Sequence, residues 1–471
     1  MKASAFLLTL ALLYPQAGAM NGVQVLLTTG DQSHLLTPEQ LNFTPQDPNL
    51  TTTIEVNKEV EYQTMEGVGA ALTESSAHLI HSLSPEKQKE VLEGFFDPQK
   101  GIGMDVVRLP IGASDFALGN YTHNDLPWGE TDPELKKFSL QRDQQAVIPT
   151  LQQALGINKD LTVVASPWSA PAWMKVGNSR TAADGLGKGR LNPEFESSYA
   201  QYFVKFIQGY WEAGIPIHLV TVQNEPHHES YGYPTMRMEF DQQGRFVSEH
   251  LRPALDQAGL KTGILVWDHN WNEPDYPLAV LSSEKVRQSV AGTAWHCYGG
   301  DVSNQSIVHD RYPELGTYFT ECSGGEWSPQ FSNNLMWTTQ NLLIGATRNW
   351  AKTVLMWNLA LDEEHGPTNG GCGNCRGVIT LHKDGTLEKN VETYLFSHYG
   401  KVVRKGAKRI ESTTKPGEWE SVAFQNPDGS LALIVMNPQN TPLSFQVNAG
   451  QHFQYSLPAQ SVATFHWQPP L

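Results

Sequence analysis

Residues 219–226 read Leu219-Val220-Thr221-Val222-Gln223-Asn224-Glu225-Pro226. The apolar and β-branched residues at the start predict a short buried strand, and the proline ends it because it has no N–H to donate to a neighbouring strand. Glu225 is therefore expected at the C-terminal end of a strand, beside the amide of Asn224. Residues 317–325 have the same form, since Thr317-Tyr318-Phe319-Thr320 leads to Glu321 and two glycines follow. Two glutamates at matching ends of two strands are typical of paired-carboxylate glycosidases.

Apolar runs of this kind recur along the chain, separated by helical stretches. The eight runs are residues 65–70, 105–111, 161–166, 218–222, 263–267, 293–298, 317–320 and 353–357. Two helix starts are marked by Ser84-Pro85-Glu86 and Asn192-Pro193-Glu194, each an N-cap followed by proline and an acid. Alternating strands and helices predict an α/β fold, a (β/α)8 TIM barrel. An open doubly wound sheet is the alternative, but no G-x-G-x-x-G opens the first helix of a dinucleotide-binding version.

The C-terminal part of the chain has a different pattern. Short alternating strands are expected at residues 421–424, 431–436, 443–447 and 461–467, with Asn-Pro turns between them. They predict a small antiparallel β-sandwich, and because it is small we expect the N-terminal β segment to complete it. The predicted division is residues 21–60 for the N-terminal sandwich strands, 61–400 for the catalytic barrel and 401–471 for the C-terminal sandwich.

The first residues have the features of a signal peptide. Lys2 supplies the positive charge, residues 5–14 an apolar core, and Ala17-Gly18-Ala19 a cleavage site. We therefore assign residues 1–20 to a signal peptide and expect an exported protein, secreted or periplasmic. The apolar run is too short to span a membrane. The formal net charge of -16 argues against nucleic acid or an anionic membrane as a partner.

The chain has four cysteines. In an exported protein Cys372 and Cys375 can form a disulfide within their loop. Zinc bound with the help of His365 is the alternative, although a structural zinc site usually needs a second ligand pair. Cys297 and Cys322 lie in two different strand-like runs, and we expect them to be buried thiols.

Polar and aromatic residues gather where the predicted strands end, which is where TIM barrels place their chemistry. In chain order this rim contains Arg108, Asp115, Trp168, Asn224, Glu225, Asp268, His269, His296, Tyr298, Glu321, Trp357 and Asn358. Carboxylates, amides and aromatic rings suit the hydrolysis of a glycosidic bond. A single glutamate at a strand end is more often a salt-bridged residue, but two in matching contexts favour a catalytic pair. Arg108 is expected to be structural, paired with a carboxylate under the site.

Seven short motifs, in order, resemble those of glycoside hydrolase family 30. They are GMDVVR (103–108), SPWSAP (166–171), QNEP (223–226), WDHN (267–270), HCY (296–298), FTECS (319–323) and WNLAL (357–361). The resemblance covers nearly all of the chain after the signal peptide. This family includes glucosylceramidases and endo-β-1,6-glucanases, so the resemblance implies a (β/α)8 barrel, a β-sandwich built from both chain ends, and retention of anomeric configuration.

The resemblance also implies roles for individual residues. Glu225 matches the acid/base, expected to be protonated first, and Glu321 the nucleophile, expected to be ionised, at a separation of about 5 Å. The residues that match sugar-binding positions are Asp115, Trp168, Asn224, His296, Tyr298 and Trp357. No cofactor is implied. The loop at residues 371–376 is closer to glucanase-type members than to lysosomal glucosylceramidases.

Several alternatives remain at this point. The sequence does not separate glucosylceramide from β-1,6-glucan as the substrate, although the polar, Gly-rich loop at residues 176–188 favours a saccharide chain over a lipid. Activity on β-xylan or β-fucosides is also open. Two other classes are a non-catalytic carbohydrate-binding protein of the same fold and a metal-dependent hydrolase using Asp268, His269 and His296.

Overall fold

The computed structural model describes residues 22–182 and 189–469. The predicted signal peptide and part of the predicted loop at 176–188 therefore lie outside the described residues. None of the helices in the described ranges has the length and apolar content needed to span a bilayer.

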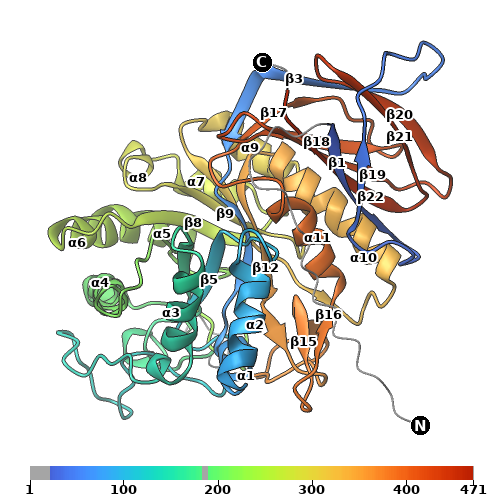
Figure 1. Ribbon diagram of the computed structural model, residues 1–471. Coiled ribbons are helices and arrows are strands. Elements are labelled where there is room, and N and C mark those ends of the chain that lie inside the picture. Colours follow the sequence, from blue (N-terminus) through green and yellow to red (C-terminus); the bar gives the residue numbers. More distant parts are fainter. Residues whose placement is uncertain (1–21, 183–188, 470–471) are drawn as a thin grey trace, which may run out of the picture.

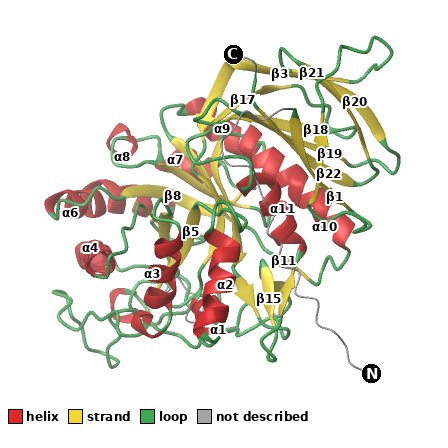
Figure 2. Ribbon diagram, in the orientation of Figure 1, coloured by secondary structure: helices red, strands yellow, loops and turns green. Residues whose placement is uncertain are grey.

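Eight parallel strands close into a barrel, which confirms the predicted fold class (Figure 2). In chain order they are β4 (Gly67–Ala71), β5 (Val106–Ile111), β6 (Thr162–Pro167), β7 (Leu219–Thr221), β8 (Gly263–Asn270), β9 (Gly292–His296), β10 (Gly316–Glu321) and β12 (Ala351–Asn358). Each overlaps its predicted run, and β12 pairs with β4 to close the ring. The strands are buried on both faces, which explains why their sequences are apolar throughout rather than alternating.

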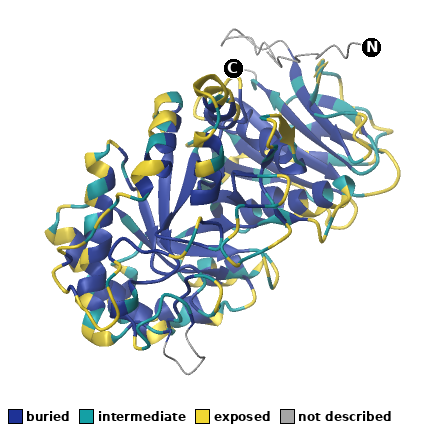
Figure 3. Ribbon diagram, turned by 90° about the horizontal axis from the view of Figure 1, so that it is seen from below, coloured by how far each residue is buried: buried dark blue, intermediate teal, exposed yellow. Residues whose placement is uncertain are grey.

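Helices surround the barrel and present their apolar faces to it (Figures 1 and 3). Their bounds are α1 (Glu74–His81), α2 (Pro85–Phe96), α3 (Val147–Ile157), α4 (Glu196–Glu212), α5 (Phe240–Arg245), α6 (Arg252–Gln257), α7 (Asp275–Val280), α8 (Glu284–Arg287), α9 (Asn304–Arg311), α10 (Phe331–Thr338) and α11 (Val391–Gly400). The π-helical segments η4 (Phe246–Leu251) and η5 (Thr339–Ala346) continue α5 and α10. Both predicted caps form, because the side chain of Ser84 accepts from the Lys87 N–H and that of Asn192 from the Glu194 N–H.

Strands from both chain ends build the second domain, so the blue N-terminal strand β1 lies among red C-terminal strands in Figure 1. Its nine strands run in the order β2-β1-β22-β19-β18-β17-β3-β20-β21. Their bounds are β1 (Val23–Thr29), β2 (Thr37–Leu41), β3 (Thr53–Thr64), β17 (Lys408–Ser412), β18 (Glu420–Gln425), β19 (Leu431–Asn437), β20 (Leu443–Asn448), β21 (His452–Leu457) and β22 (Ser461–Trp467). β17 and β21 were not predicted, although β21 has the alternating pattern of a strand, with Phe453, Tyr455 and Leu457 between polar residues.

Buried polar contacts fasten the sandwich to the barrel. His398 of α11 is hydrogen-bonded to the hydroxyl of Thr28 on β1, at 2.8 Å, and to that of Thr464 on β22, at 2.9 Å. Arg348, just after η5, donates to the carbonyls of Ser412 and Ser421 at 3.1 and 3.0 Å. These contacts hold strands β1, β22, β17 and β18 of the sandwich at a defined place beside the barrel.

All four cysteines are in disulfides. Cys372 pairs with Cys375, and the zinc alternative is wrong because both thiols are consumed. The expectation of two buried thiols at Cys297 and Cys322 is also wrong, since these residues form the second disulfide with Cα atoms 5.4 Å apart. The parallel register explains this, because His296 is paired with Glu321 and the residues after them meet.

Short strands cover the end of the barrel where the loops converge. They are β11 (Gly324–Gly325), β13 (Ala360–Leu361), β14 (Cys375–Arg376), β15 (Ile379–Leu381) and β16 (Leu387–Lys389). The antiparallel pair β11 and β14 joins the segment after Glu321 to the Cys372–Cys375 loop. This link connects two walls of the site described next.

Candidate active site

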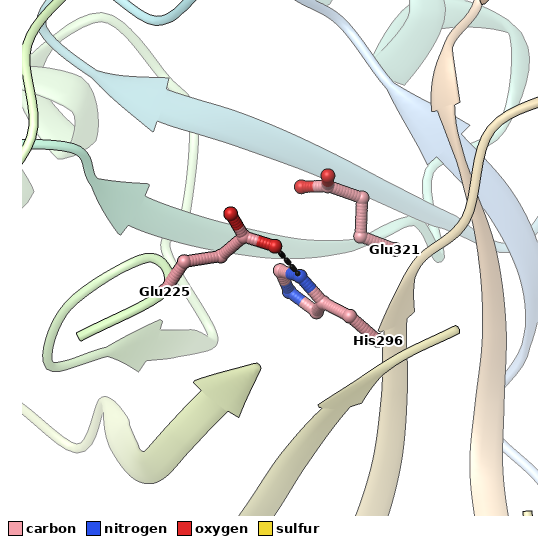
Figure 4. Close-up of side chains that lie close together, drawn as sticks. All are labelled: Glu225, His296 and Glu321. Atoms are coloured by element: carbon pink, nitrogen blue, oxygen red, sulfur yellow. Dashed lines mark hydrogen bonds and ion pairs between the residues drawn. The ribbon is translucent and has the colours of Figure 1, made fainter. Parts of the chain in front are cut away.

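Glu225 and Glu321 meet at the C-terminal end of the barrel (Figure 4). Glu225 follows β7 and has a positive φ of 48°, whereas Glu321 is the last residue of β10. One oxygen of each carboxylate and one nitrogen of His296 lie within 4.8 Å of one another. This separation suits the ~5 Å of retaining glycosidases and is shorter than the ~6.5–9.5 Å that inverting enzymes need for a water molecule.

Glu321 is held by donors on both of its oxygens. Nη1 of Arg108 donates to Oε2, and the hydroxyl of Tyr298 donates to Oε1 at 2.9 Å. Arg108 is completely buried, and its Nη2 also donates to Oδ1 of Asn224 at 2.9 Å and Oδ2 of Asp268 at 2.8 Å. The structure therefore places Arg108 beneath the site, where one guanidinium fixes three acceptors.

Asp268 is the central acceptor of the network. Besides Arg108 it accepts hydrogen bonds from the hydroxyls of Thr221 and Thr320 at 2.6 and 2.7 Å, and it contacts Nε2 of His296 at 2.9 Å. Burial alone would raise the pKa of Asp268, but Arg108 and His296 hold it well below its usual range. Asp268 is therefore a permanent carboxylate under the site.

A backbone irregularity turns Asp268 toward the barrel axis. Trp267 and Asp268 have φ values of 75° and 62°, and the register of β8 against β9 shifts between Trp267 and His269. Positive φ is costly for residues other than glycine, so this bulge is maintained only by the contacts around it. The sequence motif WDHN marked the place but gave no signal of the bulge.

His296 lies between Asp268 and Glu225, with Nδ1 at 3.1 Å from Oε1 of Glu225. Burial opposes a charged ring, but Glu321 and Asp268 raise the pKa of His296 to about 9. The resulting imidazolium, together with His269, lowers the pKa of Glu225 despite its burial. Burial in turn raises the pKa of Glu321 above its usual range.

This distribution of protons differs from the expectation that Glu225 is protonated and Glu321 ionised. Two buried carboxylates this close cannot both ionise without strong repulsion, so the pair titrates together. The sequence did not reveal that an imidazolium would lie against Glu225. Because the pKa of His296 is raised to about 9, a charged ring near neutral pH donates from Nδ1 to Glu225 and holds a proton that Glu225 can receive.

Stacked indoles form one wall of the site. Trp168 and Trp357 lie with ring centroids 5.0 Å apart and planes 19° apart, and both are only 2% exposed. The guanidinium of Arg108 lies over both rings, at 5.1 and 5.6 Å from the centroids. The two rings are therefore rigid edges of a pocket rather than open platforms.

The segment leading into the Cys372–Cys375 loop packs tightly against Asp115. The N–H of Asn369 donates to the Asp115 carbonyl at 2.7 Å, and a Cβ on Gly371 would lie 2.3 Å from Cβ of Asp115. Burial and the charges of Glu321 and Glu225 raise the pKa of Asp115 to about 8. Near neutral pH Asp115 is thus a carboxylic acid, which both donates and accepts hydrogen bonds as a sugar hydroxyl does.

Of the other polar residues near the site, the sequence suggested a role only for His269, as a candidate metal ligand. Gln223 orients the Trp168 segment by donating to its carbonyl at 2.8 Å. Nε2 of His269 lies 3.7 Å from Glu225, and burial lowers the pKa of His269 to about 4. The adjacent His227 and His228 contact different partners, Glu273 and Tyr233. A pattern of residue types cannot show such partners, because they come from separate loops.

The alternative metal trio of Asp268, His269 and His296 is not brought together at ligand distances in the described part of the chain. The group that does have such spacing there is Glu225, His296 and Glu321. Both ring nitrogens of His296 already contact carboxylates, those of Asp268 and Glu225. These two contacts suit a histidine that holds a proton between two carboxylates.

Comparison with known proteins gives one consistent result. Residues 65–403 match the glycosyl hydrolase family 30 TIM-barrel domain and residues 406–465 match the family 30 beta sandwich domain. An endo-1,6-beta-D-glucanase of Trichoderma harzianum is 31% identical over 446 residues, which cover 91% of this chain and 89% of the relative. The lysosomal acid glucosylceramidase of Mus musculus is 30% identical over 437 residues, covering 87% and 82%. The solved structure of an endo-β1,6-glucanase has a TM-score of 0.88 and 34% identity, and covers 95% of this chain and 100% of its own.

Proposed function

Because this chain belongs to glycosyl hydrolase family 30 and is therefore a glycoside hydrolase, we propose that it cleaves β-1,6-glucan by a retaining mechanism with Glu321 as nucleophile and Glu225 as acid/base. The observation that carries the proposal is the approach of the two carboxylates to within 4.8 Å at the barrel mouth. The presence of both carboxylates disfavours a non-catalytic carbohydrate-binding protein.

The first half-reaction forms a glycosyl-enzyme. Glu321 attacks the anomeric carbon, and a new carbon–oxygen bond replaces the bond to the leaving sugar. Arg108 and Tyr298 donate to both oxygens of Glu321, which favours its ionised form and orients it. The leaving oxygen takes a proton from Glu225.

His296 is the source of that proton. The ring holds it on Nδ1, 3.1 Å from Glu225, while Asp268 fixes the ring from the other side. Transfer along this hydrogen bond turns Glu225 into the acid and leaves His296 neutral. In the second half-reaction Glu225 takes a proton from water, the hydroxide oxygen bonds to the anomeric carbon, and the bond from that carbon to Glu321 breaks. The proton then passes from Glu225 back to Nδ1 of His296 along the same hydrogen bond, which restores the starting state.

The remaining site residues are proposed to hold the sugar. Oδ1 of Asn224 is occupied by Arg108, so its amide N–H groups are free to face a sugar hydroxyl. Asp115 faces the same pocket as a neutral acid, and Trp168 and Trp357 limit the width of the pocket. Hydrogen bonds to the 2-hydroxyl that strengthen in the transition state are a known source of rate in retaining glycosidases.

A saccharide substrate is supported by the similarity to endo-β-1,6-glucanases and by the polar loop after Val176. Glucosylceramide is the second candidate, because the mouse glucosylceramidase is also 30% identical. The test incubates the purified chain with linear β-1,6-glucan, linear β-1,3-glucan, β-xylan, glucosylceramide micelles and an aryl β-glucoside. We expect release of β-1,6-linked oligosaccharides. Turnover of glucosylceramide without turnover of the glucan would assign the second candidate instead.

Export is also proposed. Two disulfides support it, since such bonds persist in oxidising compartments. Mass spectrometry of the protein purified from culture medium or periplasm would give its N-terminus, which we expect near residue 20. Recovery of all the active protein from the cytosol would contradict this proposal.

A further inference from the structure

A groove of about 660 Å³ begins beside Glu321 and runs toward the β-sandwich. Tyr298, whose hydroxyl contacts Glu321, and Cys322, the residue after Glu321, line its inner end. Residues 333–340 of α10 and η5 form one side, and Pro438 and Gln460 from the sandwich lie at the far end. Tyr298 therefore belongs both to the lining of the groove and to the candidate active site, so the two adjoin.

The lining of this groove carries no charged side chain among the described residues. It consists of Cys297, Tyr298, Cys322, Ser323, Gly324, Trp327, Ser328, Asn333, Asn334, Met336, Trp337, Thr338, Gln340, Met356, Pro438 and Gln460. The lining thus combines hydroxyl and amide groups with the aromatic rings of Tyr298, Trp327 and Trp337. In a chain with a formal net charge of -16, a neutral lining of this extent fits a neutral ligand with many hydroxyl groups.

Aromatic rings are exposed along the groove. Trp327 is 55% exposed, and Trp337 and Tyr298 are each 45% exposed. The Trp327 ring lies directly on the backbone of Gly325, because a Cβ there would be 2.0 Å from the ring. Gly325 in turn pairs with Cys375. The indole is thus held in place by the disulfide loop while one part of it remains open to solvent.

We propose that this groove binds the sugar units of a neutral β-glucan chain that extend beyond the bond being cleaved, with Trp327 as the main stacking surface. The inference rests on the proposed function and adds to it an extended binding site outside the catalytic pocket. Sugar rings present C–H faces that pack on indole, and their hydroxyls match the amide and hydroxyl groups of the lining.

The chemistry of the groove favours a saccharide over the other occupants. An acyl chain would leave the amides and hydroxyls of Asn333, Ser323 and Gln460 facing apolar surface, which is unfavourable. An acidic polysaccharide would find no cation in the lining to pair with. A neutral glucan satisfies both the polar groups and the aromatic rings.

The test uses Trp327→Ala and, as a conservative variant, Trp327→Phe. The control is Trp211→Ala, which removes an indole that is 68% exposed on α4, outside the groove lining. Each protein is assayed on an aryl β-glucoside, on β-1,6-linked oligosaccharides of increasing length, and on linear β-1,6-glucan. Circular dichroism and melting curves verify folding.

We expect Trp327→Ala to keep its activity on the aryl glucoside but to raise KM for the polymer by about tenfold, which corresponds to ~1.4 kcal/mol. Trp327→Phe recovers most of that loss, and Trp211→Ala matches wild type. Equal kinetics of Trp327→Ala and wild type on polymer would overturn the groove assignment alone. A wild type inactive on β-1,6-glucan would overturn the proposed function as well. Loss confined to glucosylceramide micelles would show a lipid occupant.

Discussion

Nδ1 of His296 lies 3.1 Å from Oε1 of Glu225, a hydrogen-bond distance at which a charged imidazole donates to the carboxylate. Because the pKa of His296 is raised to about 9 by Glu321 and Asp268, the donated proton is retained through neutral pH. The acid of the proposed mechanism is thus a histidine–glutamate pair rather than an isolated glutamic acid.

This relationship predicts the alkaline limb of the pH profile. His296 loses its proton as the pH rises through about 9, so kcat/KM of wild type should fall there. In His296→Asn the proton must remain on Glu225 itself, and the limb should move to lower pH. Initial rates of hydrolysis of β-1,6-linked oligosaccharides between pH 4 and pH 10 test this, because their leaving sugar needs a proton. An unchanged limb in the variant would mean that His296 does not hold the proton.

The two carboxylates should respond differently to substitution. Glu225→Gln should lower kcat on glucan by about 10²–10⁴-fold, the usual contribution of general acid–base catalysis. It should lose less on an aryl glucoside whose leaving group needs no proton, and added azide should restore turnover. Glu321→Gln should be inactive on both substrates. Added azide should give no β-glycosyl azide, the product with retained configuration, with this variant. The reverse pattern would exchange the two roles.

Asp115 should make stability depend on pH. Its pKa is about 8 in the folded protein and near the ordinary aspartate value of 3.8 in the unfolded chain. Between these values the unfolded chain has released the proton that the folded protein keeps, so stability falls as the pH rises from about 4 to about 8. Asp115→Asn removes this dependence. Its melting temperature should equal that of wild type near pH 4 and exceed it at pH 8, and equal differences at both pH values would contradict the assignment.

The Cys297–Cys322 disulfide should stabilise the site as well as the fold. It joins the residue beside His296 and Tyr298 to the residue after Glu321, so it fixes the contact between Tyr298 and Glu321. The double variant Cys297→Ala/Cys322→Ala should lose about 3 kcal/mol of stability, because the bond closes a loop of 25 residues. It should also lower kcat more than it changes KM.

The second disulfide supplies the control for this experiment. Cys372→Ala/Cys375→Ala opens a loop with a sequence separation of only 3 residues and should cost less stability, about 2 kcal/mol. Denaturant unfolding and steady-state kinetics of both double variants separate the effects. If Cys297→Ala/Cys322→Ala kept the wild-type kcat, the disulfide would have no part in positioning Glu321.

Strand patterns predicted most of the fold because each barrel strand is buried on both faces and so is apolar throughout. The rule did not reach β21, which is not apolar throughout: Phe453, Tyr455 and Leu457 alternate with polar residues, and the strand pairs fully with β20. Pairing partners are set by the tertiary structure, and a strand at the edge of a sheet needs little apolar surface of its own. The N-terminal strands were expected in the sandwich only because its C-terminal part was too small.

The ends of strands also revealed where the site residues gather, since a TIM barrel brings all such ends to one face. The contacts that join those residues could not be predicted from the sequence. The bulge that turns Asp268 inward, the position of His296 against Glu225, and the disulfide between Cys297 and Cys322 all depend on the relative register of neighbouring strands. The sequence therefore predicted a protonated Glu225 and an ionised Glu321, because it did not reveal that His296 would lie against Glu225.

The central claim is that Glu225 and Glu321 act together in a retaining hydrolysis. The most direct test is proton NMR of the first sugar anomer formed from an aryl β-glucoside, with Glu321→Gln as the control. The claim predicts that the β-anomer appears first, converts to the equilibrium mixture by mutarotation, and is absent with Glu321→Gln. An α-anomer appearing first, or undiminished hydrolysis by Glu321→Gln, would contradict it.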